Sequence, residues 1–353
     1  MKTNSMKNHL RSTLLALSTA SLLVSISCNK DDGFVNSDPV INDQSFSVAE
    51  NSATGSQVGA VEAFDANQGQ ELTYIIISGN INEAFLFAND GVLIVNNAEE
   101  LDYEVNDRFT LVVNVLDGFG GSDEATITIN VEDLVEAKDL EVGVIAFYPF
   151  NGNADDQSGN GLNGTVVGAS LTSDRNGNLN SAYEFDGIND YIDLREREEF
   201  DLARYQHYAI SVWIKPANIT TGVILSKYIS AGDNRMWWMN LNEGSILYTV
   251  PEDGLSGLEN YDRLSSEADL NVWRHVVLNF DGANYTLYID AEVRSTVVKS
   301  KNMLLESPTA KTLIGGIHFS SSLFDLLYEG VIDDVRFHSR SLSEPEIEYL
   351  FTN

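Results

Sequence analysis

The residues with the clearest capacity for chemistry lie in a loop dense in glycine, asparagine and aspartate, residues 151–164 (NGNADDQSGNGLNG). A helix is disfavoured here, because each interior glycine costs about 1 kcal/mol relative to alanine. Irregular backbone that combines carboxylate and carbonyl oxygens is the environment that Ca²⁺ prefers. The loop is therefore a candidate calcium site, to which carbonyl groups of Asn151 or Asn153 could add oxygens. The alternative is that Asp156 forms an Asx turn.

Acidic residues also recur at the ends of strand-like segments between residues 39 and 134. The segments are Ala49-Glu50-Asn51, Asp65-Ala66-Asn67, Leu101-Asp102-Tyr103-Glu104, Asp117-Gly118 and Val131-Glu132-Asp133. None of these segments is specific alone, but their order along the chain resembles that of a cadherin repeat over residues 39–134. The resemblance implies a small β-sandwich of immunoglobulin-like form.

The resemblance to cadherins further implies a calcium site at the end of the repeat, where the chain passes to its neighbour. Its ligands would be Glu50, Asp102, Glu104 and Asp133. Several carboxylates in one small pocket repel one another unless a divalent cation joins them. The alternative is a set of solvated loop acids, because the segment after Asp133 lacks the family's closing ligands. In that family Asp65, Asn67 and Asp117 would complete a site with a preceding repeat, and we expect them to form turns here.

Residues 143–353 contain several short motifs that share one family pattern. They are Tyr148-Pro149-Phe150, DQSGNG at 156–161, TSDR at 172–175, Phe185-Asp186-Gly187, Trp273-x-His275, LYID at 287–290 and GVIDDVR at 330–336. They resemble the laminin-G-like, concanavalin A-type jelly-roll domain of bacterial surface proteins. This implies two packed antiparallel sheets whose first and last strands are adjacent. It also implies that Asp156 and Asp333 share one calcium ion, the alternative being that Asp333 caps a strand end.

Aromatic residues of the same region are candidates for sugar binding, because sugar rings present apolar faces that stack on aromatic planes. The candidate ligand-binding residues are Trp237, Trp238 and Tyr285, with Tyr228, Tyr248 and Tyr261 nearby. Successive side chains of a strand point to opposite faces, so at most one of Trp237 and Trp238 belongs to the core. For any single aromatic residue, the alternative is core packing.

No catalytic signature stands out. Related sandwiches include glycosidases with two carboxylates in a Glu-x-Asp-x-x-Glu pattern, and the nearest strings here, at 184–189 and 199–204, lack the final Glu. The acid and nucleophile of a retaining glycosidase therefore cannot be assembled from either string. The histidines are dispersed and form no zinc-binding spacing. We predict a binding protein, and the remaining enzymatic alternative is a glycosidase built from distant carboxylates.

Composition restricts the partners and the fold. The chain of 353 residues has a formal charge of −32, with 53 acidic residues against 21 Lys and Arg. Nucleic-acid binding is excluded as a function class, because no basic patch is present to neutralise phosphates. The single cysteine, Cys28, excludes an intrachain disulfide. Many short runs rich in Val, Ile, Thr, Tyr and Phe, separated by turn residues, indicate an all-β chain.

The elements that must position these residues follow from hydrophobic alternation. We expect one sandwich at 39–134, a short linker at 135–142 and a second sandwich at 143–353. Among the expected strands, Thr73–Ile77 has a buried type of sequence, 236–241 and 245–250 form a hairpin, and 313–319 is continuous. Ser343 with Glu346 three residues later forms a capping box, which predicts a short terminal helix.

The first 27 residues have the features of a secretory signal peptide: three basic residues, no acid, and an apolar run from Leu14 to Ile26. Ser27-Cys28 resembles a bacterial lipoprotein cleavage site, which implies that Cys28 becomes lipidated. The sequence that follows, Asn29-Lys30-Asp31-Asp32, is similar to the surface-export signal of Bacteroidetes-type lipoproteins. Residues 28–38 would then be a flexible tether.

Together these features predict an outer-membrane lipoprotein that faces the cell exterior, with a cadherin-like spacer and a lectin-type jelly roll ordered by calcium. The predicted partner is a carbohydrate, either a glycan or a polysaccharide. The alternative from a different class is an adhesin or structural surface protein whose partner is another cell-surface protein.

Overall fold

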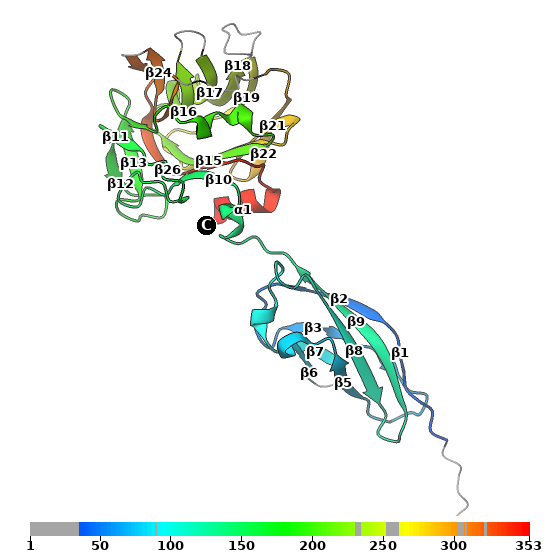
Figure 1. Ribbon diagram of the computed structural model, residues 1–353. Coiled ribbons are helices and arrows are strands. Elements are labelled where there is room, and N and C mark those ends of the chain that lie inside the picture. Colours follow the sequence, from blue (N-terminus) through cyan, green and yellow to red (C-terminus); the bar gives the residue numbers. More distant parts are fainter. Residues whose placement is uncertain are drawn as a thin grey trace, which may run out of the picture. The chain divides into compact units, whose positions relative to one another are not determined.

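The computed structural model describes residues 35–88, 90–229, 234–251, 261–302, 307, 309–320 and 323–353. The predicted signal peptide and Cys28 therefore lie outside the described residues. The chain divides into two compact units, with Leu134 ending the first unit and Val135 beginning the second (Figure 1). The described part of the chain contains no helix that is long and apolar enough to span a bilayer. The predicted all-β fold class is confirmed.

The first unit is a small β-sandwich. Its strands are β1 (Val40–Ile41), β2 (Gln44–Ala49), β3 (Gln57–Ala60), β4 (Ala63–Phe64), β5 (Thr73–Ser78), β6 (Phe85–Phe87), β7 (Val92–Val95), β8 (Arg108–Leu116) and β9 (Ser122–Glu132), with 3₁₀ turns η1 (Ile81–Glu83) and η2 (Ala98–Glu100). One sheet has the order β2-β9-β8-β5 and a second has the order β3-β7-β6, while β1 pairs with β4. Strand β2 runs parallel to β9, and the other pairs are antiparallel.

The core of the first unit comes from strict alternation along β8 and β9. Leu111, Val113 and Val115 point inward from β8, and Ile127 and Ile129 point inward from β9, all fully buried. Strand β5 differs from the expected buried run. It lies at the edge of its sheet and pairs only with β8. Two of its isoleucines, Ile75 and Ile77, are about half-exposed. The sequence pattern does not show this, because β-branched residues favour extended backbone whether or not they are buried.

The second unit is a larger sandwich followed by a helix. Its strands are β10 (Val144–Tyr148), β11 (Thr165–Val167), β12 (Ser170–Thr172), β13 (Ala182–Asp186), β14 (Tyr191–Asp193), β15 (Tyr208–Pro216), β16 (Thr221–Ile229), β17 (Asn234–Asn242), β18 (Ser245–Pro251), β19 (Tyr261–Glu267), β20 (Arg274–Phe280), β21 (Asn284–Ile289), β22 (Glu292–Val298), β23 (Lys311–Ile314), β24 (Ile317–Ser320), β25 (Leu323–Asp325) and β26 (Glu329–His338). The 3₁₀ turns are η3 (Asp139–Glu141), η4 (Glu198–Phe200) and η5 (Leu202–Arg204), and the helix is α1 (Glu344–Thr352).

Two large antiparallel sheets form the jelly roll. The eight-stranded sheet has the order β12-β13-β26-β15-β20-β21-β22, and β10 also pairs with β26. The seven-stranded sheet has the order β11-β14-β23-β16-β17-β18-β19. The pairing of β10 with β26 confirms that the first and last strands are adjacent. The predicted hairpin joins β17 to β18 through Glu243 and Gly244, which both have positive φ, as a type I′ turn requires.

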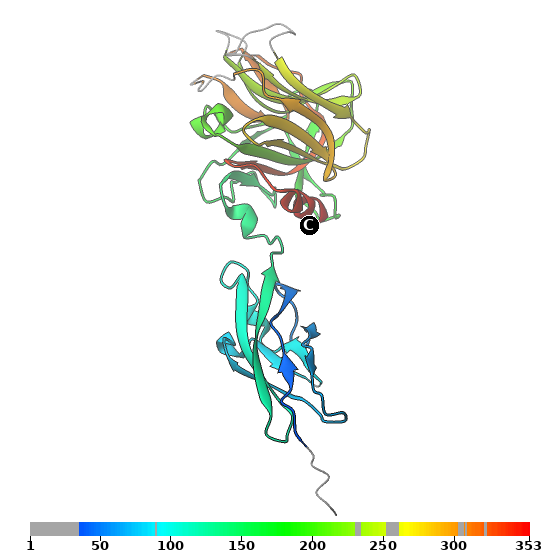
Figure 2. The same ribbon diagram turned by 90° about the vertical axis from the view of Figure 1, so that its right-hand side faces the viewer.

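Strand β15 is buried along nearly its whole length, which an alternating half-exposed strand would not be. Its residues Ile210, Val212 and Ile214 face the sandwich core. On the other face, Ala209 packs in a smaller cluster with Ile347 and Leu350 of α1. Helix α1 thus covers part of the outer face of the eight-stranded sheet (Figure 2). Its N-terminus has the predicted capping box between Ser343 and Glu346.

The expected continuous strand over 313–319 is wrong. It divides into β23 and β24 at Gly315 and Gly316. Gly315 has a φ of +82°, and a Cβ at this position would lie 2.5 Å from the ring of Phe185. Only glycine combines this backbone conformation with so close an approach, so the strand must end here. Short strands such as β6, β12 and β14 carry too few residues to show a recognisable alternation.

Candidate functional site

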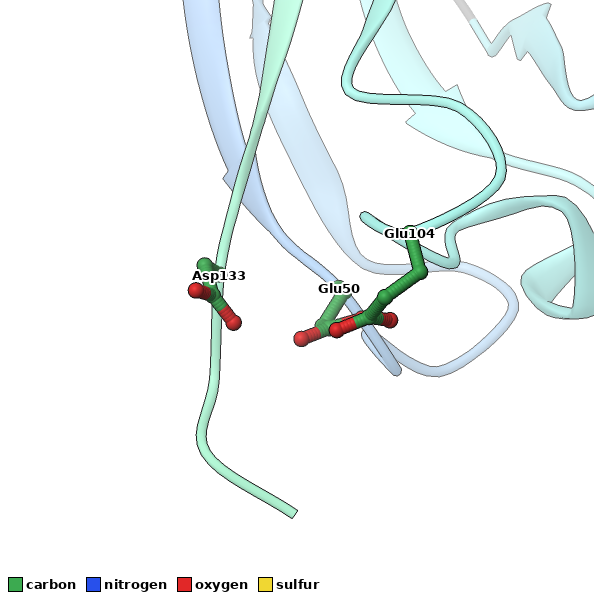
Figure 3. A group of neighbouring side chains, drawn as sticks. All are labelled: Glu50, Glu104 and Asp133. Carbon is green, nitrogen blue, oxygen red and sulfur yellow. The ribbon is translucent and has the colours of Figure 1, made fainter. Parts of the chain in front are cut away.

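Three carboxylates converge at the end of the first unit (Figure 3). Each of Glu50, Glu104 and Asp133 offers one oxygen, and these oxygens all lie within 4.8 Å of one another. Glu50 follows the end of β2, Asp133 follows the end of β9, and Glu104 lies in the loop before β8. The parallel register of β2 and β9 pairs Ala49 with Glu132. The residues that follow them, Glu50 and Asp133, are thereby brought together.

Glu50 is held in place by the backbone around it. Its Oε2 accepts a hydrogen bond from the amide of Tyr103 at 2.9 Å, and its Oε1 accepts one from Leu134 at 2.7 Å. Its own amide donates to the carbonyl of Glu132 at 3.0 Å. The side chain is 1% exposed, whereas Glu104 and Asp133 are exposed. The buried carboxylate is therefore fixed by its surroundings, whereas the other two carboxylates are accessible to solvent.

This arrangement fits a calcium ion. Two oxygens bound to one Ca²⁺ at roughly 2.3–2.6 Å cannot be more than about 5 Å apart, and the three carboxylates satisfy that limit. The first unit also has almost no basic side chains to neutralise these carboxylates. Between residues 35 and 134 the sequence has 18 acidic residues and one basic residue, Arg108. Like charges this close favour a divalent cation over further ion pairs.

The fourth predicted ligand, Asp102, is used differently. Its Oδ1 accepts a hydrogen bond from the amide of Glu104 at 3.2 Å, and Asn106 donates its backbone amide to the carbonyl of Asp102 at 2.7 Å. Asp102 therefore shapes the loop that presents Glu104, and it is not one of the three converging carboxylates.

The acids expected to form turns in the first unit do so. Asp65 accepts the amide of Asn67 at 2.6 Å, and Asp117 accepts the amides of Phe119 and Gly121 at 2.7 and 2.9 Å. Burial would raise the pKa of Asp117, but hydrogen bonds from Asn36 and from the backbone lower it below its ordinary value. These residues organise the opposite ends of strands from the Glu50 group.

Asp156 has a structural role that corrects the predicted calcium site in the second unit. Its Oδ1 accepts hydrogen bonds from the amides of Phe147 and Ser158, and its Oδ2 accepts from the amide of Leu162 and the hydroxyl of Ser158, at 2.9–3.0 Å. These donors fill the acceptor positions that a cation would need. Burial raises the pKa of Asp156, but the four hydrogen bonds outweigh it and lower the pKa. Asp156 therefore forms an Asx turn with Ser158, which was the alternative to a calcium ligand.

Asp333, the other expected ligand, faces a guanidinium group. Its Oδ2 lies 3.1 Å from Nη1 of Arg175, which also lies 2.6 Å from Oδ2 of Asp334. Asp333 is 2% exposed, and burial, with the neighbouring Asp334, raises its pKa to about 8. Arg175 supplies the positive charge that was expected from a metal ion. Arg175 belongs to the TSDR motif. Its ion pair with Asp333 could not be predicted, because the two residues are far apart in the sequence.

The two adjacent tryptophans of β17 point in opposite directions, as the strand geometry predicts. Trp237 is fully buried in the main core, and its indole N–H donates to the carbonyl of Phe200 at 3.0 Å. Tyr285 is also buried in that core. Both are therefore removed from any surface that a sugar could reach, which corrects their assignment as ligand-binding residues.

Trp238 is the partly exposed member of the pair. It packs edge-on against Tyr228 and Tyr261, with ring centroids 5.3 and 5.5 Å away. Arg263 lies over the ring of Tyr261 at 5.5 Å, and Phe319 lies 6.2 Å from Tyr228. We call Trp238, Tyr228, Tyr261 and Phe319 the aromatic group. Its members Trp238, Tyr228 and Tyr261 lie on the seven-stranded sheet, on the face away from the main core, and Phe319 lies on the neighbouring strand β24.

The two strings considered for glycosidase chemistry have structural partners. Asp201 is buried and lies 2.7 Å from Nζ of Lys227, which is also buried. Asp186 accepts hydrogen bonds from the amides of Ile188 and Asn189, which close the turn after β13. The buried lysine was not predicted, because its alternating position in β16 is one that normally holds an apolar residue.

Two family models match the chain. Residues 44–132 match the cadherin domain, and residues 186–348 match the concanavalin A-like lectin/glucanases superfamily. The expected order of a cadherin domain followed by a laminin-G-like domain is thereby confirmed. The protocadherin-like wing polarity protein stan of Drosophila melanogaster is 34% identical over 99 residues, which is 27% of this chain and 3% of that protein.

Several solved structures are similar to part of the chain. Domain 4 of AbnA, an extracellular arabinanase of Geobacillus stearothermophilus in complex with arabinotriose, is 18% identical and has a TM-score of 0.46, covering 59% of this chain and 97% of that domain. The binding domain of Paraclostridial Mosquitocidal Protein 1 is 16% identical with a TM-score of 0.47, covering 60% and 52%. The chain thus spans about half the length of that binding domain.

Proposed function

We propose that this chain is a surface-exposed carbohydrate-binding protein, in which a calcium-ordered cadherin domain carries a lectin-type jelly roll. The observation that carries the proposal is the aromatic group around Trp238. A large, partly exposed indole on a rigid strand, held edge-on by two tyrosines, presents an apolar plane of fixed orientation. Such planes suit the apolar faces of sugar rings. Asn240, two residues along the same strand, adds a polar group on the same face.

Calcium has a defined place in this proposal. Glu50, Glu104 and Asp133 would hold the ion and supply negatively charged oxygen ligands at the end of the cadherin domain. The bound ion would neutralise their mutual repulsion and fix the position of Asp133, beyond which the chain enters the second unit. Lipid attachment at Cys28 would place both units at the outer face of the outer membrane. These parts of the proposal rest on the sequence of residues 1–34 and on the chemistry of the three carboxylates.

A protein-binding adhesin is the second candidate, and one observation favours it. Strand β5 is an edge strand, and the side chains of Ile75 and Ile77 are 45% and 51% exposed. An uncharged apolar edge strand is a surface on which another protein can add a strand. The cadherin domain would then be the adhesive unit, and the jelly roll would be accessory.

A glycan array, probed with and without a calcium chelator, tests the proposal and separates the two candidates. We expect the wild-type chain to bind a subset of glycans and the Trp238→Ala variant to lose that binding. Trp273→Ala is the matched control, because Trp273 is also partly exposed but lies outside the aromatic group. Equal binding by wild type and Trp238→Ala, or an array on which the folded chain binds nothing, would overturn the assignment.

A further inference from the structure

A cavity of about 490 Å³ lies in the second unit, away from the aromatic group. Its walls come from β10, β26, β15 and β20 of the eight-stranded sheet, from the loop after β10 and from the end of α1. Figure 1 and Figure 2 show α1 beside β10 and β26. The volume is in the range typical of small-ligand sites. The cavity is lined in part by Phe147, Asn151, Gln157, Arg175, His275 and Arg336.

Arg336 is the unusual member of this lining. The register places it between Phe147 on β10 and Ser211 on β15, and its guanidinium carbon lies 3.5 Å from the centre of the Phe147 ring. No carboxylate or carbonyl of the described residues accepts a hydrogen bond from it. The side chain is partly buried, and burial lowers the pKa of its guanidinium. Arginines that leave bulk water usually have a paired anion.

The other arginine of the cavity shows the contrast. Arg175 has ion pairs with Asp333 and Asp334, donates to the carbonyl of Asn353 at 3.1 Å and lies 4.5 Å over the ring of Trp213. The nearby carboxylates are therefore already used by Arg175. Asp334 attracts Arg336 electrostatically, but it accepts its hydrogen bond from Arg175 and not from Arg336. The hydrogen-bond donors of the Arg336 guanidinium therefore remain open to an anion from outside.

The remaining polar groups of the cavity suit hydroxyl groups. Asn151 and Gln157 are exposed, and each amide can both donate and accept hydrogen bonds, as a sugar hydroxyl also does. His275 is 1% exposed, with Nε2 2.7 Å from the hydroxyl of Ser211, while its Nδ1 has no partner within the described part of the chain. The cavity thus combines the Arg175–Asp334 ion pair with neutral polar groups and with the guanidinium of Arg336, which is bonded to no carboxylate.

We propose that this cavity binds an acidic sugar, with the carboxylate on the guanidinium of Arg336 and the hydroxyls on Asn151 and Gln157. A planar guanidinium matches a carboxylate with two parallel hydrogen bonds, which gives both affinity and orientation. The inference builds on the carbohydrate-binding function proposed above but uses a different face. Trp238 lies on the seven-stranded sheet, whereas Arg336 belongs to the eight-stranded sheet.

Calorimetric titration of the full chain with D-glucuronate, D-glucose and sodium sulfate tests this site. We expect saturable binding of glucuronate and at least tenfold weaker binding of glucose. Arg336→Met should weaken glucuronate binding at least tenfold. Arg294→Met is the matched control, because Arg294 lies outside the cavity and pairs with Glu292. Gln157→Ala, at an exposed position, should weaken binding several-fold without affecting folding, which guards against misfolding of the Arg336 variant.

Three results would overturn the proposal: no glucuronate binding by the folded wild-type chain, equal effects of the two arginine variants, or sulfate binding as tight as that of glucuronate. The last would mean that the cavity recognises charge alone. Trp238→Ala should leave glucuronate binding unchanged while it abolishes binding to the array. If the array result holds and glucuronate does not bind, the acidic-sugar site is wrong and the aromatic site stands.

Discussion

Lys227 and Asp201 form an ion pair inside the second unit, with Nζ of the lysine 2.7 Å from Oδ1 of the aspartate. Both side chains are at most 2% exposed. Burial raises the pKa of Asp201 and lowers that of Lys227, and each partner opposes the effect of burial on the other. Lys227 also donates to the carbonyl of Arg197. The pair therefore fastens the turns η4 and η5 to strand β16.

Removal of one member of this pair should be far more damaging than removal of both. Lys227→Met leaves Asp201 buried without a cation and should lower the free energy of unfolding of the second unit by about 3–5 kcal/mol. The double variant Lys227→Met/Asp201→Leu should recover most of that loss. Urea unfolding measures both. Arg294→Met, which breaks the exposed pair with Glu292, should cost less than about 1 kcal/mol. A double variant as unstable as the single one would contradict this account.

The adjacent tryptophans should separate stability from binding. Trp237→Ala creates a core cavity and removes the hydrogen bond to Phe200, so we expect a loss of about 3–5 kcal/mol in unfolding free energy. Trp238→Ala should cost less, because this side chain is partly exposed, and should abolish glycan binding. Thermal unfolding and array binding measured on both variants test the difference. Similar stability losses in the two variants would show that Trp238 is also a core residue.

Calcium should stabilise the first unit through Glu50. At a calcium concentration one hundred times the dissociation constant, the expected gain in unfolding free energy is about 2.7 kcal/mol. Glu50→Gln should remove most of this gain, because the neutral amide is a weaker calcium ligand. Glu62→Gln is the control, since Glu62 is outside the converging group. The measurement is thermal unfolding with calcium and with chelator, and an equal calcium shift in wild type and Glu50→Gln would rule this site out.

Asp156 should matter for folding and not for calcium. Asp156→Ala removes the acceptor of four hydrogen bonds in the loop of residues 151–164, so the melting temperature of the second unit should fall markedly. The calcium-dependent shift of the first unit should be unchanged. Asp155→Ala provides the control, because that neighbouring side chain is exposed. Loss of a calcium response in the second unit of Asp156→Ala would restore the metal role of this residue.

His338 should make the second unit sensitive to acid. It is fully buried, with Nε2 3.0 Å from the carbonyl of Leu140, and burial lowers its pKa from 6.5 to about 4. The unfolded chain therefore binds this proton more tightly than the folded chain. The contribution to stability is complete above pH 6.5 and is lost as the pH falls toward 4, by at most about 3 kcal/mol.

The variant His338→Gln should lack this part of the pH dependence. Urea unfolding between pH 4 and 7 should show a shallower loss of stability for His338→Gln than for wild type. His207→Gln is the control for the substitution itself, since His207 is a more exposed histidine elsewhere in the second unit. Identical slopes for wild type and His338→Gln would assign the acid sensitivity to other groups.

The sequence predicted well those features that depend on local pattern. Alternation located β8, β9 and β15, the capping box located α1, and the strand rule showed that only one of Trp237 and Trp238 is in the core. Features that depend on distant partners were missed. Asp333 meets Arg175 through the pairing of far-separated segments, and the exposure of β5 depends on its place at a sheet edge. Neither residue type nor spacing contains that information.

The strand order of the jelly roll has a consequence for its biosynthesis. Strand β26 is the last strand of the chain, yet it lies between β13 and β15 and also pairs with β10. During synthesis, the strands that pair with β26 must keep open edges until residues 329–338 have been made. The first unit pairs only its own contiguous residues and can fold sooner. A chain released early would therefore carry a folded first unit and an incomplete, aggregation-prone second unit.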